Sequence, residues 1–206
     1  MVRAVPAHLV DEVVVVDNGS TDRTVAEARK AGARVVAEPR RGYGAACWAG
    51  VRAVAVETAV VVFLDGDGSQ DPGEIGRVLA PLFEDRADLV LGARRSVGRS
   101  PDRPLHAVLG TRVVARVLRW RFGVRLQDLG PFRAIRREAV LALGLREMSY
   151  GWPVEMVVKA ARAGLRIHEV EVTQRQRLGG RSKVSGTVTG SLRAGWRFVR
   201  VALRHG

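Results

Sequence analysis

Two aspartates that directly follow an apolar run are the residues best suited to chemistry. Residues 59–64 are apolar and predict a buried strand, and the segment Asp65-Gly66-Asp67 that follows predicts a loop at the edge of a sheet. Because only a glycine separates them, the two carboxylates can converge on one divalent cation, which would in turn hold phosphates. The same residues also suit a solvated turn between a strand and a helix. The rest of the chain has to decide between these interpretations.

A second acidic loop follows the first predicted strand. The β-branched run Glu12–Val16 predicts a strand buried on both faces, and Asp17-Asn18-Gly19-Ser20 after it predicts a turn into a helix. Ligands of parallel sheets bind beyond the carboxyl ends of the strands. We therefore expect Asp17 and the loop that begins at Asp65 to lie at one edge of the same sheet.

Strands and helices alternate along the first half of the chain. Strands are expected at residues 12–16, 33–37, 59–64 and 88–92, and the helices between them at about 21–30, 42–57 and 72–84. A short strand near Arg133, a helix that carries Glu155 and a last strand at 165–172 follow. This pattern predicts an α/β fold of the Rossmann-like kind, with a mostly parallel sheet and helices on both faces. A length of 206 residues suits one such domain.

Basic residues dominate the charge of the chain. Lys+Arg 34 against Asp+Glu 21 gives a net charge of +13, which predicts an anionic partner. Aromatic residues make up 5% and do not alternate with the basic tracts, which argues against a nucleic-acid partner. No apolar run approaches the roughly 20 residues of a membrane span, and the amino terminus lacks the apolar core of a signal peptide. With a single cysteine as well, we expect a cytoplasmic protein.

The last residues of the chain predict a basic amphipathic helix. Within 187–206, Leu192, Trp196 and Leu203 fall on one stripe and arginines fall on the adjoining stripe. Such a helix is typical of peripheral contact with a membrane, here the inner face of the cell membrane. Its apolar stripe equally suits packing against the domain itself or a second copy of the chain.

Four segments carry a resemblance to a known family. They are, in chain order, Val14–Asp22, Arg41–Ala46, Leu64–Asp67 and Asp128–Ala134. In this order and spacing they resemble the family 2 glycosyltransferases of the GT-A fold. Glu155 in its helix and the segment Arg181–Gly186 are most similar to the dolichol- or polyprenol-phosphate sugar transferases. The resemblance predicts a GT-A domain over residues 1–186, followed by the helix at 187–206.

One part of the family pattern is missing at the amino terminus. Members of the family begin with a strand and a Pro-x-x-Asn-Glu-like loop that lie upstream of anything in this sequence. Either the true start lies upstream of Met1 or the protein lacks a central strand. We favour the upstream start, because a lost central strand leaves backbone groups unpaired at about 1–3 kcal/mol for each buried one. A chain extended upstream is accordingly expected to be more stable.

The resemblance implies a sugar transfer from a UDP- or GDP-linked donor, with inversion at the sugar. Mg²⁺ or Mn²⁺ would neutralise the leaving nucleotide, and Asp67 and Asp65 would hold the ion. The donor would be bound by residues of the three glycine-containing loops, namely Asp17, Gly19, Ser20, Arg41, Gly44, Asp65 and Gly66. A polyprenyl or dolichyl phosphate is the acceptor that the resemblance implies. Its phosphate or the donor diphosphate would be bound by Arg94, Arg177, Arg181 and Lys183.

Other functions stay open on the sequence alone. A phosphate acceptor is already anionic and attacks unaided, whereas a hydroxyl acceptor needs a base, for which Asp128 and Glu155 are the candidates. Asp128 also suits a turn cap, and Glu155 suits an ion pair with Lys159 four residues on. A catalytically silent nucleotide-sugar binder or a basic nucleic-acid-binding module would explain part of the pattern. A nucleotidyltransferase would place a Gly-x-Gly-Thr-Arg loop after its first strand, and this chain shows no such order.

Overall fold

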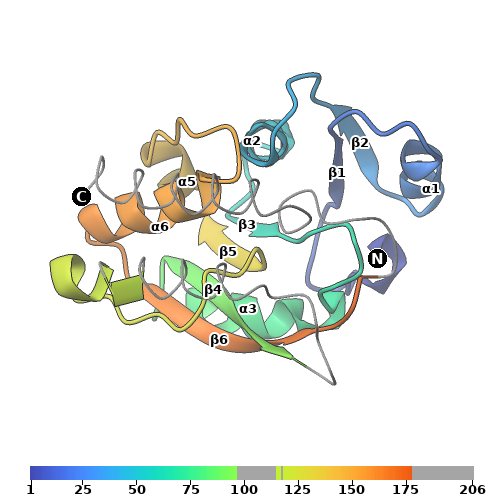
Figure 1. Ribbon diagram of the computed structural model, residues 1–206. Coiled ribbons are helices and arrows are strands. Elements are labelled where there is room, and N and C mark those ends of the chain that lie inside the picture. The colour runs from blue at the N-terminus through green and yellow to red at the C-terminus, as the bar shows by residue number, and fades with distance from the viewer. Residues whose placement is uncertain (97–114, 117, 178–206) are drawn as a thin grey trace.

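The computed structural model describes residues 1–96, 115, 116 and 118–177 (Figure 1). The strands are β1 (Val14–Asp17), β2 (Arg34–Ala37), β3 (Val60–Phe63), β4 (Leu89–Ser96), β5 (Arg133–Arg136) and β6 (Ile167–Gln174). The α-helices are α1 (Thr24–Lys30), α2 (Tyr43–Ala53), α3 (Ile75–Phe83), α5 (Arg137–Ala142) and α6 (Trp152–Arg162), and short 3-10 turns cover Val2–Ala4 and Pro72–Glu74. This order confirms the predicted alternation of strands and helices.

The first two strands form a parallel pair of their own. Val14 to Asp17 of β1 lie beside Arg34 to Ala37 of β2, in register, and α1 connects the two strands. β1 and β2 make up a two-stranded sheet that is separate from the other strands the structure describes. The expectation that the acidic loops after β1 and β3 lie at one edge of the same sheet is therefore wrong, because the two loops follow strands of different sheets. Helix α2 packs on β1, where a β-carbon on Gly50 would be 3.4 Å from a methyl group of Val16.

The remaining strands form a mixed sheet in the order β3-β5-β4-β6. β4 and β6 pair in parallel over eight residues, whereas β5 lies antiparallel between β3 and β4. The sequence predicted the short strand at Arg133 but not its place in the sheet. Local patterns determine which residues are extended, while pairing depends on contacts between distant segments. The fold is α/β as predicted, with the parallel strands interrupted by β5.

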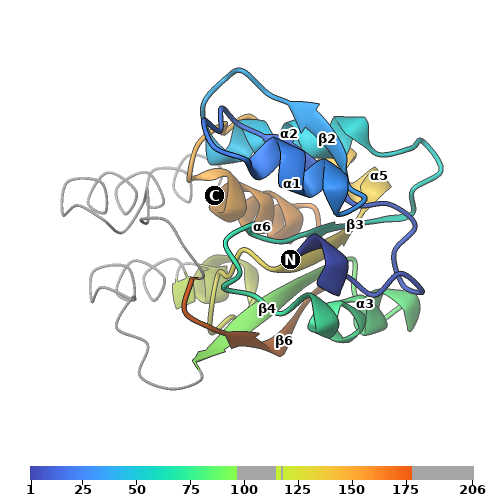
Figure 2. The same ribbon diagram turned by 90° about the vertical axis from the view of Figure 1, so that its right-hand side faces the viewer.

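Apolar side chains on both faces of this sheet meet helices. Leu89 and Leu91 of β4 point into a core with α2, α5 and α6, and Val90 between them points into a second core with α3. This alternation follows from the two-residue period of a strand. Figure 2 shows α6 and α3 on opposite sides of the sheet. Helices on both faces therefore fix the ends of the strands, which is where the acidic loops lie.

Several predicted segments fall outside the described residues. They include most of the loop that glycine, serine and proline predict at 96–104, of which Ser96 belongs to β4 instead, most of the helix that the sequence predicts at about 105–121, and the helix expected at 187–206. Residues 115, 116 and 118–122 are helical as expected. None of the helices in the described part of the chain is long and apolar enough to cross a membrane.

A cluster of charges ties the start of β4 to the start of β6. Asp88 accepts hydrogen bonds from the backbone N–H of Arg166 at 2.9 Å and from its guanidinium at 2.9 and 3.1 Å, and Arg136 lies 3.6 Å away. Chiefly through the hydrogen bond from the Arg166 side chain, the pKa of Asp88 falls to about 2. The folded state therefore favours the charged carboxylate.

This lowered pKa predicts that stability depends on Asp88 only above acidic pH. Because the folded pKa lies below the unfolded one, the contribution is full above about pH 4 and disappears as the pH falls through about 2. Asp88→Asn should cost about 2 kcal/mol of unfolding free energy at neutral pH. Urea denaturation at a series of pH values measures it, with exposed Glu57→Gln as the control. A pH-independent difference between wild type and Asp88→Asn would contradict this assignment.

Candidate active site

The loop after β3 holds its two aspartates by hydrogen bonds within the loop. Gln70 is buried and its side-chain oxygen accepts the backbone N–H of Asp65 at 3.0 Å, while a carboxylate oxygen of Asp67 accepts the N–H of Ser69 at 2.9 Å. A β-carbon on Gly66 between them would meet no atom within 4 Å. The two aspartates thus follow the end of β3, as the sequence predicted, and the space over Gly66 between them is open.

Charges of both signs act on Asp65. Burial raises its pKa, repulsion from Asp67 adds to that shift, and Arg177, Arg133 and Arg94 oppose it. The side chain of Arg177 lies 3.2 Å from Asp67, Nε to carboxylate oxygen. The two carboxylates therefore lie within the electrostatic influence of three arginines, an environment suited to a cation together with an anionic ligand.

Arg133 is a member of this site that the sequence analysis did not single out. It is fully buried, it donates to the carbonyl oxygens of Gly130 at 2.5 Å and Pro153 at 3.0 Å, and burial lowers its pKa. An arginine within a short apolar strand was the available signal. Because its charge acts on Asp65, we assign Arg133 to the charge balance of the acidic loop.

The loop after β1 is closed around Asp17. The carboxylate accepts the N–H of Ser20 at 2.8 Å, and hydrogen bonding by Ser20 lowers the pKa of Asp17. Gly19 has a φ of +83°, and a β-carbon there would be 3.1 Å from a guanidinium nitrogen of Arg41. The tertiary structure therefore brings Arg41, from the segment before α2, against Gly19, the neighbour of Ser20 in this loop.

Asn18 connects this loop to the start of α2, a role that the sequence analysis missed. Its side-chain amide donates to the carbonyl oxygens of Glu38 at 2.8 Å and Arg40 at 2.7 Å, and its oxygen accepts the N–H of Gly42 at 2.9 Å. Tyr43 follows Gly42, and its pKa is raised, chiefly by burial and next by Cys47. The negative charge of Asp65 adds to this rise, so Tyr43 lies within the electrostatic influence of Asp65. The start of α2 thus links the two acidic loops.

Gly44 is explained by close packing. A β-carbon at this position would overlap the carbonyl oxygen of Glu147 and would be 2.9 Å from the Cα of Met148. The N–H of Gly44 donates to Ser149 at 3.2 Å, and the next residue, Ala45, donates to Met148 at 3.0 Å. A donor-binding role for Gly44 stays a prediction, since these contacts account for a glycine here without a ligand.

Asp128 forms a two-pronged ion pair with Arg94. One carboxylate oxygen accepts Nε of Arg94 at 2.6 Å and its backbone N–H at 3.1 Å, and the other accepts Nη2 at 2.8 Å. Glu169 on β6 accepts the N–H of Asp128 at 2.8 Å. These contacts fix the Arg94 side chain next to the acidic loop, and they give Asp128 a positioning role besides the predicted one of a base.

Glu155 is fully buried at the start of α6. Its carboxylate accepts the backbone N–H groups of Arg146 at 3.0 Å and Glu147 at 2.7 Å, and it pairs with Lys159 at 2.9 Å. The ion pair with Lys159 is the structural alternative that the sequence left open. Glu155 thereby stabilises the 146–147 loop against which α2 packs, and a role as base stays a prediction.

The structure therefore gathers most of the predicted residues into one region. Asp65 and Asp67 lie with Arg94 and Arg177, and the loop after β1 joins them through the start of α2. Arg181 and Lys183 lie outside the described residues. Within the part of the chain that the structure describes, no group of three or more His, Cys, Asp or Glu side chains could enclose a metal. A cation would accordingly need ligands from the donor or water besides the two aspartates.

Comparison with known proteins identifies the class of this site. A family model described as glycosyl transferase family 2 matches residues 2–144. An uncharacterised glycosyltransferase of Mycobacterium tuberculosis is 44% identical over 189 residues, covering 92% of this chain and 84% of the relative. The dolichyl-phosphate hexose transferase of Haloferax volcanii is 36% identical, covering 82% and 72%. The undecaprenyl-phosphate mannosyltransferase of Micrococcus luteus is 32% identical, covering 87% and 78%.

Solved structures agree with these relatives. Glucosyl-3-phosphoglycerate synthase of M. tuberculosis, in complex with Mn²⁺, UDP-glucose and phosphoglyceric acid, superimposes with a TM-score of 0.75 at 26% identity, covering 96% of this chain and 69% of that one. The same enzyme with Mg²⁺ and UDP gives a TM-score of 0.77 at 25% identity, covering 99% and 72%. The chain therefore belongs to glycosyl transferase family 2, has the GT-A fold and is a glycosyltransferase.

Proposed function

We propose that this glycosyltransferase moves a sugar from a UDP- or GDP-sugar to a polyprenyl phosphate, with inversion and with Mg²⁺ or Mn²⁺. The observation that carries the proposal is the pair Asp65 and Asp67 among Arg94, Arg133 and Arg177. Relatives named for undecaprenyl-phosphate and dolichyl-phosphate support the acceptor, and the complexes with Mn²⁺ and UDP-glucose support the donor and the ion. We place the reaction in the cytoplasm at the inner face of the cell membrane.

The residues of the acidic loop fit a divalent cation. Asp65 and Asp67 are hard oxygen ligands that repel one another, and the space over Gly66 is open. We assign both side chains to the ion, as a DXD motif. When bound, Mg²⁺ or Mn²⁺ would neutralise negative charge that develops on the leaving nucleoside diphosphate.

The protein's own cations have complementary roles in this proposal. Arg177 contacts Asp67 from the segment after β6, so its guanidinium is available to a diphosphate beside the acidic loop. Two hydrogen bonds to Asp128 fix the orientation of the Arg94 guanidinium. We assign Arg94 to the acceptor phosphate. Asp17, Ser20 and Arg41 serve the nucleoside part of the donor.

The hydrogen bonding of both candidate bases supports a phosphate acceptor. Asp128 accepts from Arg94 and Leu129, and Glu155 accepts from backbone N–H groups and Lys159. The oxygens of both carboxylates are thus occupied by donors of the protein itself. An anionic phosphate oxygen needs no base. It attacks the anomeric carbon opposite the nucleotide, which leaves with its bonding electrons, so the configuration at that carbon inverts.

A donor and acceptor panel tests the proposal. Radiolabelled UDP- and GDP-sugars are incubated with the full chain and undecaprenyl phosphate, with Mn²⁺ or with a chelator, and lipid-extractable label is counted. We expect label in the lipid fraction for one donor, its loss with chelator, and an inverted anomeric configuration by NMR. Transfer to 3-phosphoglycerate instead would support a hydroxyl acceptor, which the phosphoglyceric acid in structural neighbours makes the second candidate. Donor binding without transfer to either acceptor would contradict both.

A further inference from the structure

The helical segment at residues 115, 116 and 118–122 has one face fixed against the core. Leu118 is fully buried, and Phe122, one turn later, packs against the same apolar cluster as α6. The helix ends at Gly123, whose φ is +68° and whose N–H donates to the carbonyl oxygen of Arg119 at 3.1 Å. The rotation of the helix about its axis is therefore set by the buried face.

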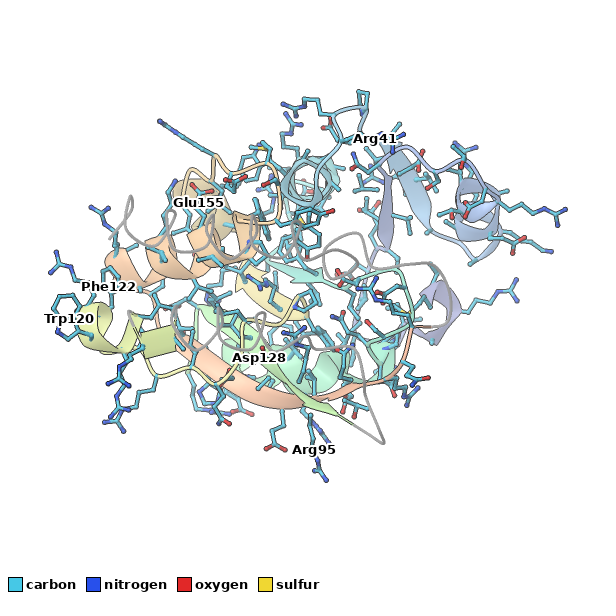
Figure 3. The ribbon with its side chains drawn as sticks, in the orientation of Figure 1. Arg41, Arg95, Trp120, Phe122, Asp128 and Glu155 are labelled. Atoms are coloured by element: carbon cyan, nitrogen blue, oxygen red, sulfur yellow. The ribbon has the colours of Figure 1, made fainter. Side chains whose placement is uncertain are left out.

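Trp120 stands on the opposite face of this segment. It lies two residues from Leu118, a rotation of about 200° on a helix, and its exposed fraction of 84% is the highest of the large apolar side chains in the described residues. Figure 3 shows it at the outer edge of the molecule, beyond Phe122. The packing of the fold does not require an indole at this position, since the buried face is complete without it.

Four arginines lie within five residues of Trp120 along the chain. They are Arg116, Arg119, Arg121 and Arg125, which are all exposed. None of them forms an ion pair with another described residue, in contrast to Arg34, Arg94 and Arg166 elsewhere in the fold. The surface around Trp120 therefore combines a wide apolar ring with positive charge that no carboxylate of the described residues neutralises.

We propose that Trp120 and these four arginines form a docking surface for the anionic headgroups of a phospholipid bilayer. An indole seats at headgroup depth, where its ring is apolar and its N–H stays hydrated, and arginines beside it bind lipid phosphates. A single-stranded nucleic acid would need several aromatic rings in series, and this surface has one exposed ring. A second copy of the same surface would bring like charges together.

The position of the surface connects it to the active site. Only residues 123–127 separate the helical segment from Asp128, which holds Arg94. Such a stretch spans at most about 20 Å. This part of the inference rests on the proposed lipid-phosphate acceptor: docking would bring an acceptor phosphate at headgroup depth within reach of Arg94. The docking itself is measured without any turnover.

Vesicle co-sedimentation tests the surface with the full chain. Vesicles of phosphatidylcholine with phosphatidylglycerol are compared with vesicles of phosphatidylcholine alone. We expect wild type to bind only the anionic vesicles, Trp120→Ala to bind about ten-fold more weakly, and Arg119→Gln/Arg121→Gln roughly twenty-fold more weakly. Two matched controls should stay within about three-fold of wild type. They are Phe83→Ala, a 68% exposed ring on α3, and Arg29→Gln/Lys30→Gln, an exposed basic pair on α1.

Two results would overturn the inference. One is no binding of wild type to anionic vesicles, and the other is equal binding by Trp120→Ala and wild type. A loss of self-association or of RNA binding in Trp120→Ala, with vesicle binding unchanged, would assign the surface to that partner instead. Thermal melting confirms that the variants fold. If the wild type binds anionic vesicles but transfers no sugar to undecaprenyl phosphate, the proposed acceptor is refuted and the docking surface is still supported.

Discussion

Asp67→Asn should lower sugar transfer roughly a hundred- to thousand-fold at saturating donor. The change keeps the size of the side chain and its capacity to accept the N–H of Ser69, which lies 2.9 Å from the Asp67 carboxylate. It removes one of the two charged oxygen ligands that Asp65 and Asp67 offer to a cation. Turnover with lipid-phosphate acceptor and Mn²⁺ affinity, followed by the electron paramagnetic resonance of the free ion, measure the two consequences separately.

Two variants near the same loop sharpen this result. Asp71→Asn removes another aspartate, which pairs with Arg175 at 2.5 Å, and should leave Mn²⁺ affinity unchanged. Arg177→Gln frees Asp67 from the contact at 3.2 Å. It should therefore bind Mn²⁺ more tightly while it transfers sugar more slowly. Unchanged Mn²⁺ affinity in Asp67→Asn would remove this residue from the proposed cation site.

Arg94→Met should destabilise the fold by about 3–5 kcal/mol, because it removes the guanidinium that compensates the buried negative charge of Asp128. The exposed side-chain fractions of the pair are 23% for Arg94 and 4% for Asp128, so water cannot replace the guanidinium. Urea denaturation at neutral pH gives the change in the free energy of unfolding.

A double mutant and an exposed ion pair provide the comparison. Arg94→Gln/Asp128→Asn removes both charges and keeps the capacity for hydrogen bonding, and should recover at least half of the loss. Arg34→Met breaks a pair with Glu12 whose exposed fractions are 45% and 36%, and should cost less than about 1 kcal/mol. If Arg94→Met is no more costly than Arg34→Met, the buried pair does not stabilise the fold. Transfer by folded Asp128→Asn then reports whether Asp128 is a base.

Local structural features could be predicted from the sequence because they depend on residues that are close together in the chain. The β-branched run before Asp17 and the apolar run before Asp65 predicted strands, and the structure places β1 and β3 there. The dipeptide Asp71-Pro72 predicts a capped helix start, and the Asp71 carboxylate accepts the N–H of Gly73 at 3.0 Å. In each case the determinant lies within a few residues of the element it controls.

Contacts between residues that are far apart in the chain could not be predicted from the sequence. Asn18 contacts Gly42, 24 residues on, and Asp128 contacts Arg94, 34 residues back, and only the first of these contacts joins segments that were expected to be neighbours. The partner of a polar side chain depends on which distant backbone comes within about 3 Å of it. For this reason the sequence named Asp128 and Glu155 as candidate bases and could not tell that both are held in internal hydrogen bonds.

The order of residue types along the chain was sufficient for the α/β class, the family and the two acidic loops, since these follow from periodicity and from motifs that occupy consecutive positions. Folding decided the rest. It inserted β5 antiparallel between β3 and β4, buried Arg133 beside Asp65 and turned Trp120 outward. Each of these outcomes depends on the burial of apolar surface and on interactions between charges from segments that are remote in the chain. Both contributions to the free energy arise only when those segments pack together.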